Sequence, residues 1–293
     1  MRTFDYIIPP EYDGVRLEQY LRSVHGYSGR ILIRLKKSPD YVQLNGVHAR
    51  VVDPIHSGDR LRILLEDIPR TPPNPDLAVP VVYEDEDVIV FDKPAHMPVH
   101  PSRNHAMDTL GNFFSAYCQR TGQNLVFRPV TRLDADTTGL CLIAKNMLSA
   151  SKLAGRVEKE YLALVGNGSE PLPDTGTIDA PIARENGDGI RRCVDYKNGK
   201  RAVTRYEVQA RGPKYTLVRV LTETGRTHQI RVHFAWLGHP LAGDEMYGGD
   251  RSDYEAHMLH CRMLRLRHPA TGKDVYLYSN SEKYAKIMNN NSL

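Results

Sequence analysis

One stretch of the chain combines a candidate reactive group with a strand: Thr131-Arg132-Leu133-Asp134-Ala135-Asp136-Thr137-Thr138-Gly139-Leu140-Cys141-Leu142-Ile143-Ala144. The apolar run from Gly139 to Ala144 predicts a strand. Asp134 comes just before this run, where a loop can aim its carboxylate while the sheet fixes its position. Taken alone, the stretch favours an ordinary role for Asp134, as a turn cap or as the surface partner of Arg132.

The second informative stretch is Thr224-Gly225-Arg226-Thr227-His228-Gln229-Ile230-Arg231-Val232-His233, which contains cations and hydrogen-bond donors but no acid. A protein that brought the two stretches together would have one ionised carboxylate held by one guanidinium. We expect no second carboxylate, no thiol and no metal cage in this set. Such a set suits chemistry at a sugar carbon without a cofactor.

A helix is predicted within the second stretch, because Thr227 is a good N-cap and Gly238 a good stop. Its apolar face would consist of Ile230, Phe234 and Leu237. His228 and Arg231, three residues apart, would share a different face. Alternation of apolar residues over the same segment leaves a strand possible. The pair His228 and His233 does not predict a metal site, because residues five apart on a helix point in different directions.

Composition restricts the class of protein. With 293 residues and 41% hydrophobic residues, the chain can form one large domain plus a small one. It lacks a run of 18 apolar residues and a signal-peptide pattern, so we expect a soluble, cytoplasmic protein without a membrane partner. The four cysteines are widely spaced and predict neither disulfides nor a zinc site. The net charge of +4 does not by itself indicate nucleic acid.

The first 66 residues are predicted to form a compact unit of two helices and a small sheet. The helices begin near Leu17 and after the possible cap Ser28, the second running to about Lys37. Asn45-Gly46 predicts a hairpin turn, with alternation continuing to Val51. Another strand is predicted around residues 61–65. Residues 15–37 carry six basic residues against one acid: Arg16, Arg22, Arg30, Arg34, Lys36 and Lys37, against Glu18.

Five prolines between Pro69 and Pro80 predict an extended linker, which we place at residues 67–80. Residues 81–293 are predicted to form one larger domain with helices at about 110–121 and 147–157. Because strands mostly follow strands, we expect an α+β fold with a mixed, largely antiparallel central sheet. The predicted strands are 88–91, 140–144, 161–165, 203–209, 215–221, 263–266 and 275–278, with a hairpin at 211–214.

Five segments resemble, in the right order, motifs of the RluA-type pseudouridine synthases, enzymes that convert uridine in RNA to its C-glycosidic isomer. The segments are Asp85 to Pro94 with Val99-His100-Pro101, Arg132-Leu133-Asp134 with Thr138-Gly139, Glu158 to Val165, Gly225 to His233 with Gly238-His239-Pro240 and Gly243-Asp244-Glu245-Met246-Tyr247-Gly248, and His260 with His268-Pro269. Two residues depart from the pattern: Thr131 stands where histidine is common, and Thr138 where serine is usual.

Residues 15–62 also resemble an S4-type RNA-binding domain, through Arg16-Leu17, Ser28-Gly29-Arg30, Asn45-Gly46 and Gly58-Asp59. The match loosens at residues 36–40, where a short glycine-containing turn is usual. The resemblance therefore implies a small α/β RNA-binding domain at 1–66, the linker at 67–80 and a catalytic domain at 81–293. The basic residues Arg16, Arg30, Arg34 and Lys37 would bind RNA phosphates.

The resemblance assigns a role to each residue of the candidate site. Asp134 would act at C1′ or C2′ of the target nucleotide, and Arg231 would hold its carboxylate. Tyr161 would stack on the base and take part in proton removal. Arg132 would help to occupy the space that the flipped base leaves, and His228 would contact RNA.

We therefore predict a monomeric RNA pseudouridine synthase that acts on structured RNA, ribosomal RNA ahead of transfer RNA. The isomerisation conserves atoms, so neither a cofactor nor a metal is expected. One alternative is an RNA-binding or ribosome-associated protein of the same fold without turnover. Another is a glycosidase-type hydrolase, which usually needs two carboxylates. Besides Asp134, the motifs offer Asp136 as a helper candidate.

Overall fold

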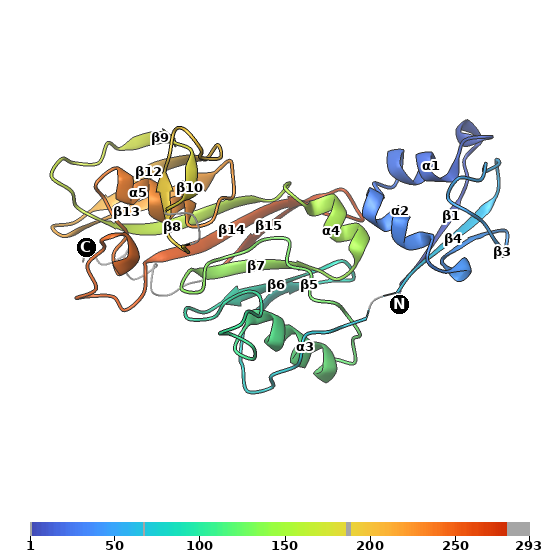
Figure 1. Cartoon of the computed structure of the whole chain (residues 1–293), viewed down its shortest axis with the longest axis horizontal. Coiled ribbons are helices and arrows are strands. Elements are labelled where there is room, and N and C mark those ends of the chain that lie inside the picture. Colours follow the sequence, from blue (N-terminus) through green and yellow to red (C-terminus); the bar gives the residue numbers. More distant parts are fainter. Residues whose placement is uncertain (1, 67, 186–188, 280–293) are drawn as a thin grey trace.

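The computed structural model describes residues 2–66, 68–185 and 189–279. The described strands form a nine-stranded sheet, a separate four-stranded sheet and a two-stranded hairpin (Figure 1). In chain order the elements are β1 (Arg2–Ile7), η1 (Pro10–Tyr12), α1 (Leu17–Ser23), α2 (Gly29–Leu35), η2 (Pro39–Tyr41), β2 (Val42–Leu44), β3 (Val47–His48), β4 (Arg60–Leu65), β5 (Val81–Glu84), β6 (Val88–Lys93), α3 (Leu110–Arg120), β7 (Thr138–Ala144), α4 (Met147–Leu153), β8 (Glu158–Gly166), β9 (Thr175–Asp179), β10 (Ile182–Arg184), β11 (Arg192–Val194), β12 (Val203–Arg211), β13 (Tyr215–Thr222), α5 (Gln229–Trp236), η3 (Glu245–Tyr247), β14 (Leu259–Arg267) and β15 (Asp274–Tyr278).

Residues 2–65, which we call the N-terminal unit, have their own sheet in the order β1-β4-β2-β3. Helices α1 and α2 bury apolar side chains at helical spacing against this sheet, including Leu17, Leu21 and Ile31. Asn45 and Gly46 both have positive φ, 52° and 84°, as the predicted two-residue hairpin turn requires. In Figure 1 this unit lies at one end of the molecule.

Two expectations for the N-terminal unit are corrected, and one strand was missed. Strand β3 ends at His48 rather than continuing to Val51. Helix α2 ends at Leu35, two residues before Lys37. Strand β1 was not predicted from the sequence; it pairs with β4, and this partner lies so far along the chain that local pattern does not indicate it.

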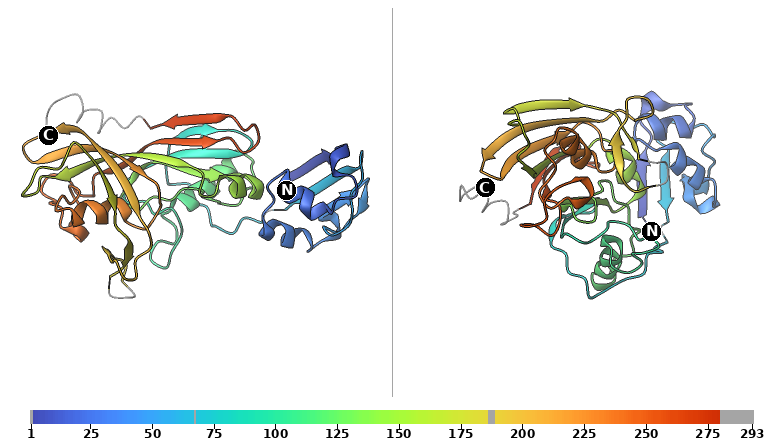
Figure 2. Two further views of the ribbon diagram at one scale, coloured as in Figure 1. Left: turned by 90° about the horizontal axis from the view of Figure 1, so that it is seen from above. Right: turned by 60° about the vertical axis from the view of Figure 1, so that its left-hand side comes forward.

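The large sheet has the order β5-β6-β7-β14-β8-β13-β12-β9, with β15 paired to β14. Among its described strands, β7 and β14 pair in parallel and the other neighbours are antiparallel, which confirms the predicted α+β class. Helix α3 covers β6, where Phe91 contacts Phe113 and Phe114 edge to face. Figure 2 shows how strongly the sheet twists along its length. Within the described residues, no helix has the length and apolar character needed to cross a membrane.

Several boundaries in this larger part differ from the sequence prediction. Strands β5, β9, β10 and β11 were missed, because they are short or lack sustained alternation. Helix α4 ends at Leu153, and Val157 lies beyond it. Helix α5 begins at Gln229, so its N-cap is His228 rather than Thr227. The strand alternative for this last segment is wrong.

Gly139, at the start of β7, allows the close approach of β7 and β14. Its φ is 104°, and a Cβ at this position would overlap the backbone of Cys261 on β14. Glycine is the residue that adopts such a conformation without strain. This close contact between Gly139 and Cys261 fixes the position of the first residues of β7. It therefore also fixes the end of the loop that carries Asp134.

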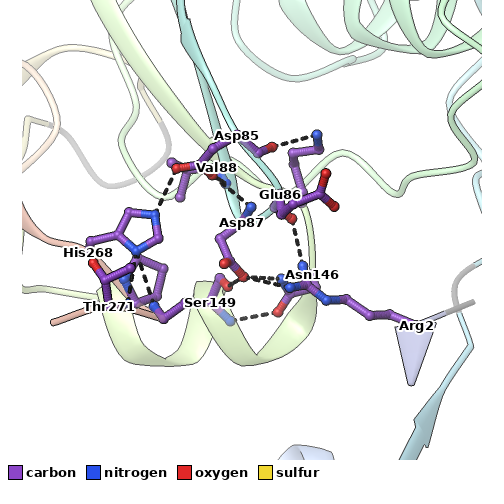
Figure 3. A network of polar contacts seen from close by, with 12 residues as sticks. Arg2, Asp85, Glu86, Asp87, Val88, Asn146, Ser149, His268 and Thr271 are labelled. Atoms are coloured by element: carbon purple, nitrogen blue, oxygen red, sulfur yellow. Dashed lines mark hydrogen bonds and ion pairs between the residues drawn. The ribbon is translucent and has the colours of Figure 1, made fainter. Parts of the chain in front are cut away.

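The N-terminal unit is attached to the rest of the chain through Arg2 and helix α4 (Figure 3). Arg2 donates to the backbone carbonyl of Glu86 at 2.6 Å and pairs with Asp87 at 3.2 Å. Asp87 is buried and also accepts from Nδ2 of Asn146, the N-cap of α4, at 2.9 Å and from Oγ of Ser149 on α4 at 2.8 Å. Leu148 of the same helix packs into the apolar cluster of the N-terminal unit.

We expect Asp87→Ala to lower the free energy of unfolding by about 1–3 kcal/mol, because buried donors on α4 would lose their acceptor. Urea unfolding measures this change. Glu86→Ala is the matched control, since its side chain is exposed and Arg2 binds only its backbone carbonyl. Equal stability of the two variants would show that the network does not hold the N-terminal unit.

Candidate active site

A cavity of about 580 Å³ opens where the loop before β7, strand β8 and the start of α5 meet. Its volume lies within the range of ordinary ligand sites, about 300–1,000 Å³. The two stretches singled out from the sequence both contribute to its wall, although they are far apart along the chain. Candidate site residues that line it are Arg132, Asp134, Tyr161, His228 and Arg231.

Asp134 faces two cationic or donor side chains across this cavity. Its Oδ2 lies 3.4 Å from Nη1 of Arg231 and 3.9 Å from Nε2 of His228. The Asp134 side chain is 27% exposed, whereas that of Arg231 is 8% exposed. The carboxylate is therefore accessible from the cavity, and the guanidinium approaches it from the buried side.

The position of His228 depends on an unusual backbone conformation at the start of α5. His228 has φ 58° and ψ 19°, the left-handed region, and it precedes the first helical residue. The side chain of Gln229 accepts hydrogen bonds from the Arg226 N–H at 3.0 Å and from Thr224 Oγ1 at 2.8 Å. These bonds tie the segment before α5 to its first residue. Thr227 is not the N-cap that the sequence predicted, and the N-cap residue His228 makes no side-chain capping bond.

Arg231 has a closer carboxylate partner than Asp134. Asp244 accepts from Nε at 2.7 Å and from Nη2 at 2.8 Å, a bidentate pair in which the Asp244 side chain is 1% exposed. The expectation of a site without a second carboxylate is therefore wrong. Asp244 lies in one of the segments that resemble the family motifs, but pairing between the start of α5 and a later loop is not visible in local spacing.

Arg231 and its neighbours are also more buried than expected. The predicted helix with one apolar face is instead buried from Gln229 to Phe234, while Leu237 is exposed. His233 hydrogen-bonds through both ring nitrogens, to Thr204 Oγ1 and the Ala180 carbonyl, each at 2.9 Å. It therefore has a structural role, while His228 faces the cavity.

Tyr161 lies on β8 and forms part of the cavity wall. Its side chain is 5% exposed, and Lys159, two residues earlier on the same face, places Nζ 5.9 Å from the ring centroid. Burial raises the pKa of Tyr161 well above its ordinary value of 10, and negative charge at neighbouring groups raises it further. The phenol is therefore protonated at neutral pH.

Lys93 holds the loop that carries Asp134 through hydrogen bonds to backbone carbonyl groups. This side chain is 1% exposed, and Nζ donates to the carbonyl oxygens of Ala135 and Pro94, each at 2.7 Å. Burial lowers the pKa of Lys93 to about 8. The next residues are held by histidines, because Thr137 bonds His257 at 2.7 Å and Thr138 bonds His260 at 2.8 Å.

The two residues that depart from the family pattern have structural partners. Thr131 is buried, and its hydroxyl accepts the Leu142 N–H at 2.9 Å. Thr138 makes the bond to His260 described above. Asp136, the other acid of this stretch, does not line the cavity; it pairs with His96 at 2.9 Å and is 39% exposed.

The basic residues of the N-terminal unit do not line the cavity. Arg16, Arg30 and Lys37 are exposed to solvent. Arg34 is half-buried and donates to the backbone carbonyl of Glu66. The structure therefore separates the candidate site residues into a cluster around Asp134 and a second group on the N-terminal unit.

Comparison with known proteins shows the class to which this fold and site belong. The family described as RNA pseudouridylate synthase matches residues 87–236. An uncharacterised RNA pseudouridine synthase of Bacillus subtilis is 36% identical over 94% of this chain and 93% of its own length. Ribosomal large subunit pseudouridine synthase D of Haemophilus influenzae is 33% identical over 94% and 91%. The solved structure of human RNA pseudouridylate synthase domain containing 1 has a TM-score of 0.57 at 27% identity, covering 74% of this chain and 88% of that one.

The chain belongs to the RNA pseudouridylate synthase family. It is accordingly an RNA pseudouridine synthase, an isomerase that acts on RNA. The resemblance read from the motifs is confirmed at the level of the family.

Proposed function

We propose that this protein isomerises specific uridines in structured RNA, with ribosomal RNA ahead of transfer RNA as its substrate. The observation that carries this proposal is the accessible carboxylate of Asp134, 3.4 Å from Arg231 in a cavity of about 580 Å³. Relatives named ribosomal large subunit pseudouridine synthase D match about nine-tenths of the chain and support the choice of ribosomal RNA.

In this reaction the N1–C1′ bond of uridine breaks, the detached uracil turns, C5 bonds to C1′, and the C5 proton is lost while N1 gains one. Asp134 would stabilise or attack the sugar at C1′ or C2′ as the first bond breaks. Arg231 would keep the carboxylate charged and oriented toward the sugar. Because atoms are conserved, the steps assigned to these residues require no cofactor.

Tyr161 would pack against the uracil ring from the wall of the cavity. Its protonated hydroxyl is a poor base, because burial opposes formation of the phenolate. We therefore propose that Tyr161 acts in removal of the C5 proton as a relay: its hydroxyl oxygen accepts that proton while its own proton passes to water, and N1 takes a proton from water, so that no proton is gained or lost overall. The hydroxyl has no part in breaking the N1–C1′ bond in this scheme.

The target nucleotide would enter the cavity by flipping out of the RNA, at a cost of a few kcal/mol. Exposed Arg132 lies on the cavity wall beside Asp134, where it would occupy the position that the base leaves. Lys159, Arg226 and His228 also line the cavity and would face the phosphates or the base. The net positive lining favours an anionic polymer.

We propose that residues 1–66 are an S4-like RNA-binding domain, joined by residues 67–80 to a catalytic domain of residues 81–293. The exposed side chains of Arg16, Arg30 and Lys37 would bind phosphates and raise affinity rather than select the uridine. Arg34 would contribute less, because it already donates to the Glu66 carbonyl.

We expect the triple variant Arg16→Gln, Arg30→Gln, Lys37→Gln to bind RNA more weakly and with a flatter salt dependence. The slope of log K against log salt should become shallower by about 0.7–0.9 for each RNA phosphate that the variant no longer neutralises. Filter binding at several salt concentrations measures it. Arg62→Gln is the control, since Arg62 pairs with Asp5 at 2.7 Å. An unchanged slope would contradict the role of the N-terminal unit.

A glycosidase-type hydrolase would need a second carboxylate free to act as an acid or base. Both carboxylate oxygens of Asp244 accept from Arg231 and its side chain is 1% exposed, and Asp136 pairs with His96 outside the cavity. Neither is placed for that role. The other alternative, RNA binding without turnover, is disfavoured by the presence of Asp134, Tyr161 and Arg231 around one cavity.

Pseudouridine mapping in cellular RNA, with and without this protein, tests the proposed function. We expect one or a few sites in ribosomal RNA to lose pseudouridine when the gene is deleted and to regain it on complementation. Complementation with Asp134→Asn should leave those sites unmodified. An identical pseudouridine map in the deletion strain would contradict the proposal, and loss confined to transfer RNA would reassign the substrate.

A further inference from the structure

Arg231 is oriented by two residues of the loop after it, Asp244 and Tyr247. Asp244 takes the Nε and Nη2 edge of the guanidinium at 2.7 and 2.8 Å. The ring of Tyr247 lies against the guanidinium face, with its centroid 5.0 Å from Cζ. With one edge and one face occupied, Nη1 is the nitrogen left to meet Asp134.

The loop that carries these residues is tightly fixed. The Asp244 carbonyl accepts the N–H groups of Tyr247 and Gly249, at 3.0 and 2.8 Å. A Cβ at Gly249 would overlap the Leu241 carbonyl oxygen, and one at Gly243, where φ is 77°, would overlap that of Ala256. Asp244 is therefore set in place by backbone contacts that do not involve Arg231.

Tyr247 also orients His228. Its hydroxyl accepts the Arg192 N–H at 2.9 Å and lies 2.8 Å from Nδ1 of His228. If the hydroxyl donates its proton to Nδ1, the imidazole proton resides on Nε2, the nitrogen that faces Asp134 at 3.9 Å. Burial lowers the pKa of His228, which agrees with a neutral ring.

We propose that Asp244 and Tyr247 are positioning residues of the isomerisation, which fix Arg231 and His228 so that one nitrogen of each faces Asp134. This inference rests on the proposed role of Asp134. Because Asp244 shares the guanidinium charge, Arg231 cannot close on Asp134 as a tight bidentate pair. The Asp134 carboxylate thus stays oriented by Arg231 but available to the sugar.

Asp244→Asn tests this proposal, because the amide has the same shape and lacks the charge. The matched control is Glu160→Gln, which neutralises another buried carboxylate, bonded to Arg219 at 2.7 Å. Glu160 precedes Tyr161 on β8, so its side chain points to the opposite face, and it does not line the cavity. Both variants neutralise a buried carboxylate that is paired with an arginine, but only Asp244 is paired with Arg231.

The rate of pseudouridine formation is measured under single-turnover conditions on ribosomal RNA from a strain that lacks the protein. The dissociation constant for the same RNA and the midpoint of thermal unfolding are measured for each variant. We expect Asp244→Asn to lower the rate by at least about 30-fold, because a 1 Å misplacement of a reacting group costs about 100-fold. RNA affinity should stay within about two-fold. Tyr247→Phe, which keeps the ring, should lower the rate by about 5- to 10-fold, because the hydrogen bond that orients His228 is removed.

Glu160→Gln should lose stability and keep its rate within about two-fold of the unaltered protein at a temperature where both are folded. The proposal is overturned if Asp244→Asn keeps the full rate, or if Glu160→Gln loses as much rate as Asp244→Asn does. Absence of pseudouridine with the unaltered protein would instead overturn the proposed function, and this proposal with it.

Discussion

Asp134→Asn will abolish pseudouridine formation, with a loss of rate of at least about 10,000-fold, the scale seen when one essential catalytic group is removed. The asparagine side chain keeps the shape of aspartate but has no negative charge to offer the sugar carbon. Because Asp134 is 27% exposed and lies on a loop held by Lys93 and His257, the fold should tolerate the change. Single-turnover assays on ribosomal RNA measure the rate.

Thermal unfolding and RNA binding are the controls for Asp134→Asn, and both should match the unaltered protein. Asp136→Asn is the matched variant, since this nearby acid pairs with His96 outside the cavity. It should keep its rate within a few-fold. Retained activity in Asp134→Asn, or equal loss in Asp136→Asn, would refute the assignment of Asp134.

Arg231→Met will both destabilise the protein and remove activity. It leaves Asp244 buried without its bidentate partner, and breaking a buried ion pair in this way costs about 3–5 kcal/mol. The rate should fall by at least about 100-fold, as on removal of a preorganised electrostatic group. Urea unfolding and single-turnover rates measure the two effects.

The double variant Arg231→Met, Asp244→Asn separates these effects. Removing the unpaired charge should restore part of the lost stability, because a neutral amide costs less to bury than a carboxylate. The rate should not recover, since the double variant has no guanidinium to hold the Asp134 carboxylate. Recovery of the rate together with stability would mean that Arg231 acts only through folding.

The sequence predicted the parts of the fold that depend on local pattern. The helix at α5, the apolar run of β7 and strand β13 are present where the sequence predicts them, although α5 begins one residue later than a cap at Thr227 implies. Strand β1 and the short strands β10 and β11 depend on pairing with distant or equally short partners. Local propensity is weak there, and tertiary contacts determine the structure.

The candidate site shows the same division. Asp134 and Arg231 were identified because each lies in a distinctive run, and the structure places them 3.4 Å apart. Asp244 was missed as a partner of Arg231, although its segment resembles a family motif, because an ion pair between a helix and a later loop depends on how that loop closes. His228 was expected on the helix itself, but it lies just before the helix, at the N-cap position and in a left-handed conformation that local pattern does not indicate.

Nucleoside analysis of RNA treated with the purified protein tests the central claim most directly, namely that the protein isomerises a uridine within RNA and does not release its base. Ribosomal RNA from a strain that lacks the protein is incubated with the purified protein and digested, and its uridine and pseudouridine are quantified. The small-molecule fraction is examined for free uracil. The account predicts that pseudouridine appears in an amount equal to the uridine lost, with no uracil released. Uridine lost as free uracil, or no pseudouridine formed from any cellular RNA, would contradict it.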